Sequence, residues 1–229
     1  MTHPVVVTVD GPAAAGKGTL ARRLASALGY AYLDTGILYR IVGMKVLRSG
    51  ARTDDTKTAC DAARSLTPAE ISRLSGHSEL RSEATGQAAS QVAAIPDVRH
   101  ALLDLQRTFA TNPPENRPGA VLDGRDIGTV VCPDATVKLF ITASVEERAR
   151  RRLLELQSRG IEGIESEILA DIRERDRRDT ERSVAPLAQP ADALVVDTTD
   201  MDADAAFLAA LDYVRQKGLV VDRHNAACG

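Results

Sequence analysis

Residues 4–20 read PVVVTVDGPAAAGKGTL: a β-branched run, a glycine-rich turn and then the start of an apolar, helix-like pattern. The valines of Val5–Val9 predict a buried strand. In Lys17–Leu28 the leucines recur every fourth residue, as on one face of a helix, and Gly29 supplies a stop. A strand, a tight turn and a helix in this order are the first unit of a parallel α/β sheet.

The turn fits the pattern G-x-x-x-x-G-K-[ST], with Gly18 inserted before Thr19. One interpretation is a glycine turn that caps a helix. The other is a phosphate site, in which backbone N–H groups and the helix dipole surround an anion, Lys17 reaches the outer phosphates and Thr19 supports Mg²⁺. The position between a strand and a helix favours the phosphate site. Its expected residues are Gly11, Pro12, Ala13, Ala14, Ala15, Gly16, Lys17, Gly18 and Thr19.

Further strand candidates alternate with helical patterns along the chain. They are Tyr30–Leu33, Ala120–Leu122, Thr136–Ile141 and Ala193–Val196. Several are apolar throughout, which is typical of strands covered on both faces, so we expect a doubly wound parallel sheet. Ser144 opens a helix with capping-box spacing, and the last helix spans about 203–216. The polar segment 51–89 predicts an inserted lobe, after which Pro96 kinks or restarts a helix.

The bulk composition excludes several classes of protein. With 229 residues and a net charge of −3, the chain predicts one compact domain and lacks the basic excess of a general nucleic-acid binder. Cys60, Cys132 and Cys228 show no CxxC spacing, which indicates a reducing compartment without disulfides or zinc. Neither a signal peptide nor an apolar run of membrane-spanning length is present, so we expect a cytoplasmic protein, and a monomer.

Charged and hydroxyl side chains gather where predicted strands end. LDTGILYR (33–40) places Thr35 and Arg40 after the second strand, and VLDGRDIG (121–128) places Asp123, Arg125 and Asp126 after the third. Asp123 stands where a Walker-B carboxylate would organise Mg²⁺ through water. Any one of these charges alone would be read as a surface ion pair, but ligands of open α/β sheets bind at this edge.

The segment 145–182 holds ten arginines and eleven acidic residues. A solvated helix with ion pairs explains most of them, including Arg150, Arg151, Arg173 and Arg177. Arg148 and Arg152 share one helix face, while Arg175, Asp179 and Arg182 share another. These two stripes predict a mobile helical lid that presents arginines to phosphates.

The reaction follows from what the motifs contain and omit. No N-K-x-D motif supports a GTPase, and no general base is evident. A phosphate acceptor, whose second pKa is about 6, needs no base because it is already ionised. The pattern therefore favours phosphoryl transfer onto a monophosphate.

Five blocks together resemble the bacterial cytidylate kinases. They are DGPAAAGKGT, LDTGILYR, AASQVAAIPDVR, LDGRDIGTVVCPDATVKLF and RDRRDTERSVAPL, spread from residue 10 to about 197 in the family's order. The resemblance implies a five-stranded P-loop kinase fold that moves the ATP γ-phosphoryl group to CMP or dCMP with Mg²⁺. It implies one domain over 1–229, with a monophosphate-binding lobe at 50–100 and a lid at 146–182.

The resemblance also implies site roles. Catalysis would depend on Lys17, Asp123, Arg125 and Arg175, and the ATP lid would contribute Arg148 and Arg152. The acceptor phosphate would be held by Arg40, Arg125 and Arg175, and the sugar would lie near Thr35 and Asp179. Cytosine would be recognised by Ser90, Arg99, Asp126 and Arg182. Asp126 has an independent rationale, because a carboxylate accepts from the N4 amine of cytosine and repels O4 of uracil.

Two departures from the family pattern stand out. Thr35 replaces the usual serine, which keeps the hydroxyl, and the segment 66–89 is shorter than the family's three-stranded insert and lacks a strand pattern. Two alternatives stay open: another P-loop nucleoside monophosphate or small-molecule kinase, and a nucleotide-binding module without catalysis. The intact Lys17 and Thr19 weigh against the second.

Overall fold

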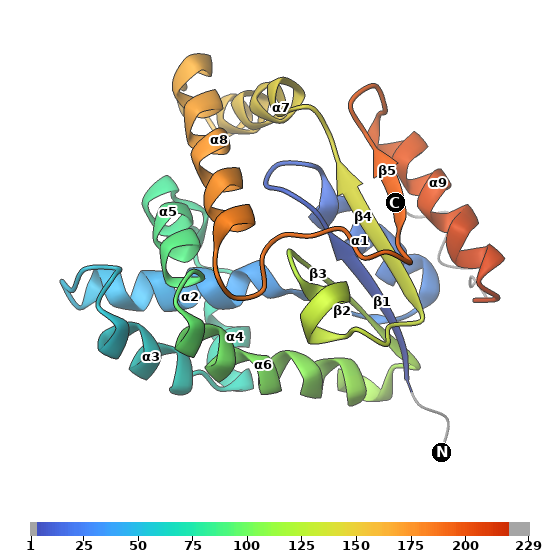
Figure 1. The fold of residues 1–229 in the computed structure, drawn as a ribbon, viewed down its shortest axis with the longest axis horizontal. Helices are drawn as coiled ribbons and strands as arrows, with labels where there is room; N and C mark the ends of the chain where they lie inside the picture. Colours follow the sequence, from blue (N-terminus) through green and yellow to red (C-terminus); the bar gives the residue numbers. More distant parts are fainter. Residues whose placement is uncertain (1–3, 220–229) are drawn as a thin grey trace.

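The computed structural model describes residues 4–219, so Cys228 lies outside the described residues. Its centre is a five-stranded sheet in the order β2-β3-β1-β4-β5, with every pairing parallel. The strands are β1 (Val5–Asp10), β2 (Ala31–Asp34), β3 (Gly119–Gly124), β4 (Val137–Thr142) and β5 (Leu194–Asp197). The predicted doubly wound parallel sheet is confirmed, with every strand boundary within two residues of the expectation (Figure 1).

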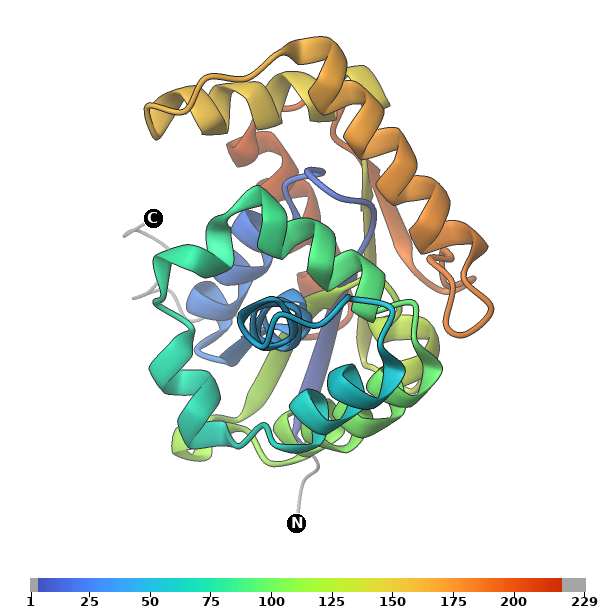
Figure 2. The same cartoon turned by 90° about the vertical axis from the view of Figure 1, so that its left-hand side faces the viewer.

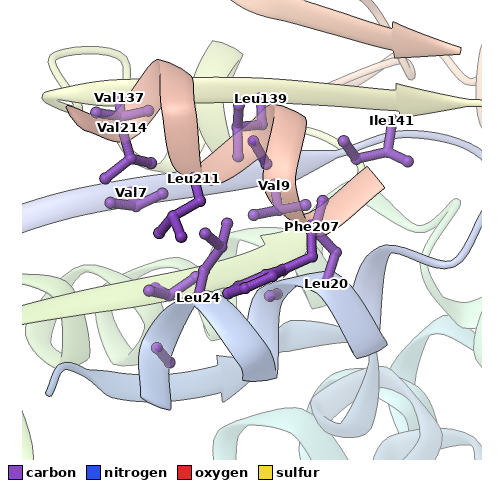
Figure 3. Packing of buried hydrophobic residues seen from close by; sticks show 14 of the residues in the cluster. Val7, Val9, Leu20, Leu24, Val137, Leu139, Ile141, Phe207, Leu211 and Val214 are labelled. Atoms are coloured by element: carbon purple, nitrogen blue, oxygen red, sulfur yellow. The ribbon is translucent and has the colours of Figure 1, made fainter. Parts of the chain in front are cut away.

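Helices cover both faces of the sheet. On one face, α1 (Lys17–Leu28) and α9 (Ala203–Gln216) pack against β1 and β4, and Figure 3 shows leucines of both helices meeting the strand valines. On the other face lie α6 (Pro96–Thr111) and the single turn η3 (Ile127–Val131). Neighbouring residues of a strand therefore pack into hydrophobic cores on opposite faces of the sheet. This explains why several strands are apolar at consecutive positions.

A helical lobe extends from the β2 edge of the sheet. It comprises α2 (Thr35–Arg48), α3 (Thr56–Arg64), α4 (Pro68–Leu74), the turn η1 (Ser78–Arg81), α5 (Glu83–Val92) and the start of α6. These elements share one apolar cluster that includes Leu38, Met44 and Leu102, each fully buried. Residues 66–89 form helices and contain no strand, and Pro96 restarts a helix at its first turn instead of kinking one.

Two further helices, α7 (Val145–Ser158) and α8 (Glu165–Glu181), form a hairpin after β4. The hydroxyl of Ser144 accepts a hydrogen bond from the N–H of Glu147 at 3.3 Å, as its capping role predicts. The Glu147 carboxylate pairs with Arg150 and Arg151 and does not return to the backbone. In Figure 2 the hairpin lies over the side of the molecule that carries the β1–α1 loop and α5.

The loop 112–118 between α6 and β3 contains the short turn η2 (Pro114–Asn116).

None of the helices within 4–219 combines the length and the apolar composition that a membrane crossing requires.

Candidate active site

The phosphate loop, residues 11–19, joins β1 to α1. A Cβ on Gly11 would lie 1.9 Å from the carbonyl oxygen of Ile141, so only glycine lets the loop pass β4 this closely. Ala14 and Gly16 have φ of 59° and 86°, in the left-handed region. Such residues among right-handed ones turn successive N–H groups toward one side, which builds an anion-binding concavity.

The loop leaves its backbone donors free of protein partners. Among the described residues, no oxygen accepts a hydrogen bond from the N–H groups of residues 13–19. The ammonium of Lys17 donates to the carbonyl of Pro12 at 2.8 Å, and Arg148, from α7, donates to the carbonyl of Ala13 at 3.2 Å. Two buried cations thus hold carbonyl groups of the loop, while its N–H groups remain available to an anion.

Charges around Lys17 also indicate an anion site. Burial lowers the pKa of Lys17, and the nearby cation Arg125 lowers it further. Asp123, at the end of β3, accepts a hydrogen bond from the hydroxyl of Tyr32 at 2.8 Å. Its Oδ2 would lie 3.2 Å from a Cβ on Gly18, so the carboxylate faces the phosphate loop. Burial, followed by the charge of Asp34, raises the pKa of Asp123.

A second site lies beyond the strand ends, between the helical lobe and α8. One pocket of about 60 Å³, which we call the acceptor pocket, is lined by all nine residues expected to bind the acceptor. They are Thr35, Arg40, Ser90, Arg99, Arg125, Asp126, Arg175, Asp179 and Arg182. They come from segments up to 147 residues apart, Thr35 to Arg182, which only tertiary folding brings together.

One end of the acceptor pocket gathers positive charge. Nε of Arg125 donates to Asp179 at 2.8 Å, and Arg40 donates to the carbonyl of Leu80 at 2.8 Å. Nε of Arg175 is buried and has no hydrogen-bond partner within residues 4–219. Burial, with repulsion from Arg125, lowers the pKa of Arg175 to about 10. Guanidinium groups that repel one another in a buried place favour binding of an anion between them.

The other end combines a carboxylate with two arginines. Oδ2 of Asp126 pairs with Arg99, whose guanidinium lies 5.3 Å from the ring centre of Tyr39. Oδ1 of Asp126 accepts no hydrogen bond from the described residues and lies 3.6 Å from Nη2 of Arg182. Among the described residues, that Nη2 is buried without a hydrogen-bond partner. The acceptor and the donor therefore stand side by side as an ion pair, and neither is engaged in a hydrogen bond with the described residues.

The remaining expected residues divide between the two sites. The hydroxyl of Thr35 donates to the carbonyl of Asp123 at 2.7 Å, which links the acceptor pocket to the carboxylate facing the phosphate loop. Thr19 is exposed on the first turn of α1. Arg152, expected to serve ATP from the lid, pairs with Glu83 and Glu155, each at 2.9 Å.

The four arginines read as solvated do form ordinary ion pairs. Arg150 and Arg151 pair with Glu147, Arg173 with Glu146, and Arg177 with Glu174 and Glu181. That part of the sequence interpretation is confirmed for Arg150, Arg173 and Arg177, whereas Arg151 is partly buried and also donates to the hydroxyl of Thr198 at 2.9 Å.

Four residues at these sites were missed by the sequence reasoning. Tyr39 lines the acceptor pocket beside Arg40, and Tyr32 holds Asp123. Arg178 donates to the hydroxyl of Ser90 at 2.7 Å, and Asp10 ends β1 under the site. Each lies inside or beside a quoted motif, but only Asp10 shows a sequence signal, since it is an acidic residue at a strand end like Asp123.

The comparisons with known proteins agree with this geometry. The model of the family described as "Cytidylate kinase" matches residues 7–216. The chain belongs to the cytidylate kinase family. Its members include the cytidylate kinase of Rhodospirillum rubrum, 59% identical over 93% of this chain and 98% of the relative. That of Granulibacter bethesdensis is 55% identical over the same shares.

The cytidylate kinase family assignment makes this protein a kinase that uses a nucleotide phosphoryl donor and acts on small nucleotides. Among solved structures, a gluconokinase from Sinorhizobium meliloti 1021 matches with a TM-score of 0.50 at 15% identity, covering 95% of this chain and 96% of its own. An uncharacterized protein from Eubacterium ventriosum gives 0.54 at 12% identity, with 92% and 98% covered. At such low sequence identities, these two matches show a shared fold and nothing more.

Proposed function

We propose that this member of the cytidylate kinase family transfers the γ-phosphoryl group of ATP to CMP or dCMP, giving ADP and CDP or dCDP. The ion pair between Oδ1 of Asp126 and Nη2 of Arg182 carries the proposal, because neither atom makes a hydrogen bond with the described residues. Cytosine presents an N4 donor beside the N3 acceptor, which complements this pair. Uracil presents an O4 acceptor beside an N3 donor, which opposes it at both atoms.

Each site then has one role in the transfer. The phosphate loop binds the ATP phosphates through its backbone N–H groups and Lys17, and Arg148 supports the loop from α7. Arg40, Arg125 and Arg175 bind the acceptor phosphate, and Thr35 and Asp179 lie at its sugar side. Because an ionised phosphate needs no base, these cations act by aligning two anions and neutralising charge in the transition state.

The residues present fit a Mg²⁺ ion at the phosphate loop. Asp123 is a buried carboxylate that faces Gly18, and the hydroxyl of Thr19 lies on the same turn of α1. Oxygen ligands of this kind, together with substrate phosphates and water, are what Mg²⁺ prefers. When bound, the ion would neutralise charge on the donor phosphates. Asp123 would orient it through water, held in place by Tyr32.

The helical lobe and the α7–α8 hairpin correspond to the proposed monophosphate-binding lobe, residues 50–100, and lid, residues 146–182. Two contacts join them: Arg178 with Ser90 and Arg152 with Glu83. The acceptor pocket of about 60 Å³ is far smaller than the roughly 300 Å³ of small-molecule sites. We therefore expect the lid and lobe to separate when CMP enters. We also propose that the protein is a monomer and acts in the cytoplasm.

A coupled ADP-release assay with ATP and CMP, dCMP, UMP or AMP tests the function. We expect the highest kcat/KM with CMP or dCMP, and we expect Asp126→Ala to reduce the preference for CMP over UMP more than it changes the KM for ATP. A preference for AMP, or transfer only to an alcohol, would contradict the proposal. ADP release with none of the acceptors would favour a module without catalysis.

A further inference from the structure

Asp10 is the last residue of β1 and directly precedes the phosphate loop, yet none of the roles above uses it. Its side chain is fully buried. Oδ1 accepts a hydrogen bond from the N–H of Ile127 at 2.8 Å, and Oδ2 accepts one from the N–H of Gly128 at 2.7 Å. Both oxygens of a buried carboxylate are therefore committed to the two residues that follow Asp126.

The backbone around this contact leaves it little freedom. Asp10 lies opposite Gly124 in the pairing of β1 with β3, so the carboxylate sits beside the start of the turn formed by residues 124–128. A Cβ on Gly128 would lie 2.8 Å from Oγ1 of Thr8 and 3.2 Å from Oδ2 of Asp10. The turn therefore rests directly on β1, and the peptide that follows Asp126 has one favourable orientation.

We propose that Asp10 is a positioning residue for base recognition: it fixes the peptide after Asp126, so that Oδ1 of Asp126 stays beside Nη2 of Arg182 and faces the base. This inference rests on the proposed function. Two hydrogen bonds to one buried carboxylate hold a backbone segment more firmly than neutral bonds would. The residue that directly precedes the phosphate loop thus sets the geometry of the site that recognises the acceptor's base.

The test is the ratio of kcat/KM for CMP to that for UMP in Asp10→Asn, at pH 8. Burial raises the pKa of Asp10 to about 6, so the wild-type carboxylate is ionised there. The amide keeps the shape of the side chain but replaces one acceptor by a donor that faces a backbone N–H. We expect the ratio to fall about five- to tenfold, as when one ordinary hydrogen bond is lost.

Thr8→Val is the matched control, because Thr8 packs under the same turn and its buried hydroxyl has no hydrogen-bond partner to lose. We expect it to leave the ratio unchanged. We also expect Asp10→Asn to add no loss of discrimination in an Asp126→Ala background, since both residues act through the same carboxylate.

Three results would overturn the proposal. Asp10→Asn could lower kcat/KM equally for CMP and UMP, or Thr8→Val could lower the CMP-to-UMP ratio as much as Asp10→Asn does. The third is that Asp10→Asn lowers this ratio as much in the Asp126→Ala background as in the wild type. If Asp10→Asn does not fold, Gly128→Ala is the substitute, because it disturbs the contact between Asp10 and Gly128 at the glycine. The ratio of kcat/KM for CMP to that for UMP is again the quantity measured. The wild-type preference for CMP over UMP tests the proposed function separately, so the two ideas can fail independently.

Discussion

The phosphate loop and the acceptor pocket are built in opposite ways. The loop is one continuous stretch, residues 11–19, whose donors are backbone N–H groups and whose shape follows from a strand, a turn and a helix. The acceptor pocket takes its nine expected binding side chains from the helical lobe, the residues that follow β3, and the C-terminal half of α8 with the residue after it. Backbone donors tolerate many sequences provided the turn forms, whereas a pocket of side chains depends on each residue. The loop therefore defines a broad class of protein, and the pocket defines the substrate.

The largest effect is expected at the loop's one charged side chain. Lys17→Met removes the buried cation whose ammonium lies at the phosphate loop, and we expect kcat to fall about 100-fold or more, because a fixed cation on transition-state charge is lost. Steady-state kinetics with saturating CMP measures it. A kcat within threefold of wild type would contradict the role of Lys17 in binding the donor phosphates. It would also contradict the assignment of the phosphate loop and the acceptor pocket to two different substrates.

The next effect is expected at the phosphate end of the acceptor pocket. Arg175→Gln removes a guanidinium whose Nε has no partner, so we expect kcat/KM for CMP to fall roughly 10- to 100-fold, with little change in the KM for ATP. Arg177→Gln is the matched control, two residues further along α8, where an exposed arginine pairs with Glu174 and Glu181. Equal losses in the two variants would mean that α8 acts through overall charge.

A smaller effect is expected at the contact between lid and lobe. Glu83→Gln weakens the pair between Glu83 and Arg152, which is partly exposed, so we expect the KM for CMP to change by about two- to threefold and kcat by less. Glu146→Gln, which weakens the exposed pair with Arg173 on the same hairpin, should change neither value. A tenfold loss of kcat in Glu83→Gln would place Glu83 in the chemistry itself.

The smallest effect concerns stability. Burial opposes the charge of Asp179, but Arg125 and Arg175 outweigh it and hold the pKa of this carboxyl below its usual 3.8. The ionised form therefore stabilises the folded protein, and this contribution is complete above the unfolded value and lost as the pH falls through the folded pKa. We expect Asp179→Asn to be less stable than wild type at pH 7, with the difference shrinking below pH 4 in urea titrations. A constant difference would contradict this.

The sequence alone was sufficient for several features of this protein. The strand Val5–Asp10, the helix Lys17–Leu28 and the stop at Gly29 follow from local patterns of burial and turn geometry, which the chain carries within a few residues. Parallel order follows as well, since strands separated by helices pair in parallel. The segment 66–89 lacked a strand pattern for an equally local reason, and it is helical.

Only the tertiary structure decided which side chains meet. No local pattern predicts that Arg178 donates to Ser90, that Arg152 pairs with Glu83, or that Asp10 is buried against Ile127 and Gly128. The physical reason is that periodicity and capping are properties of neighbours in the chain. Hydrogen bonds across 50 to 120 residues depend instead on how helices and strands pack, which no short stretch of sequence contains.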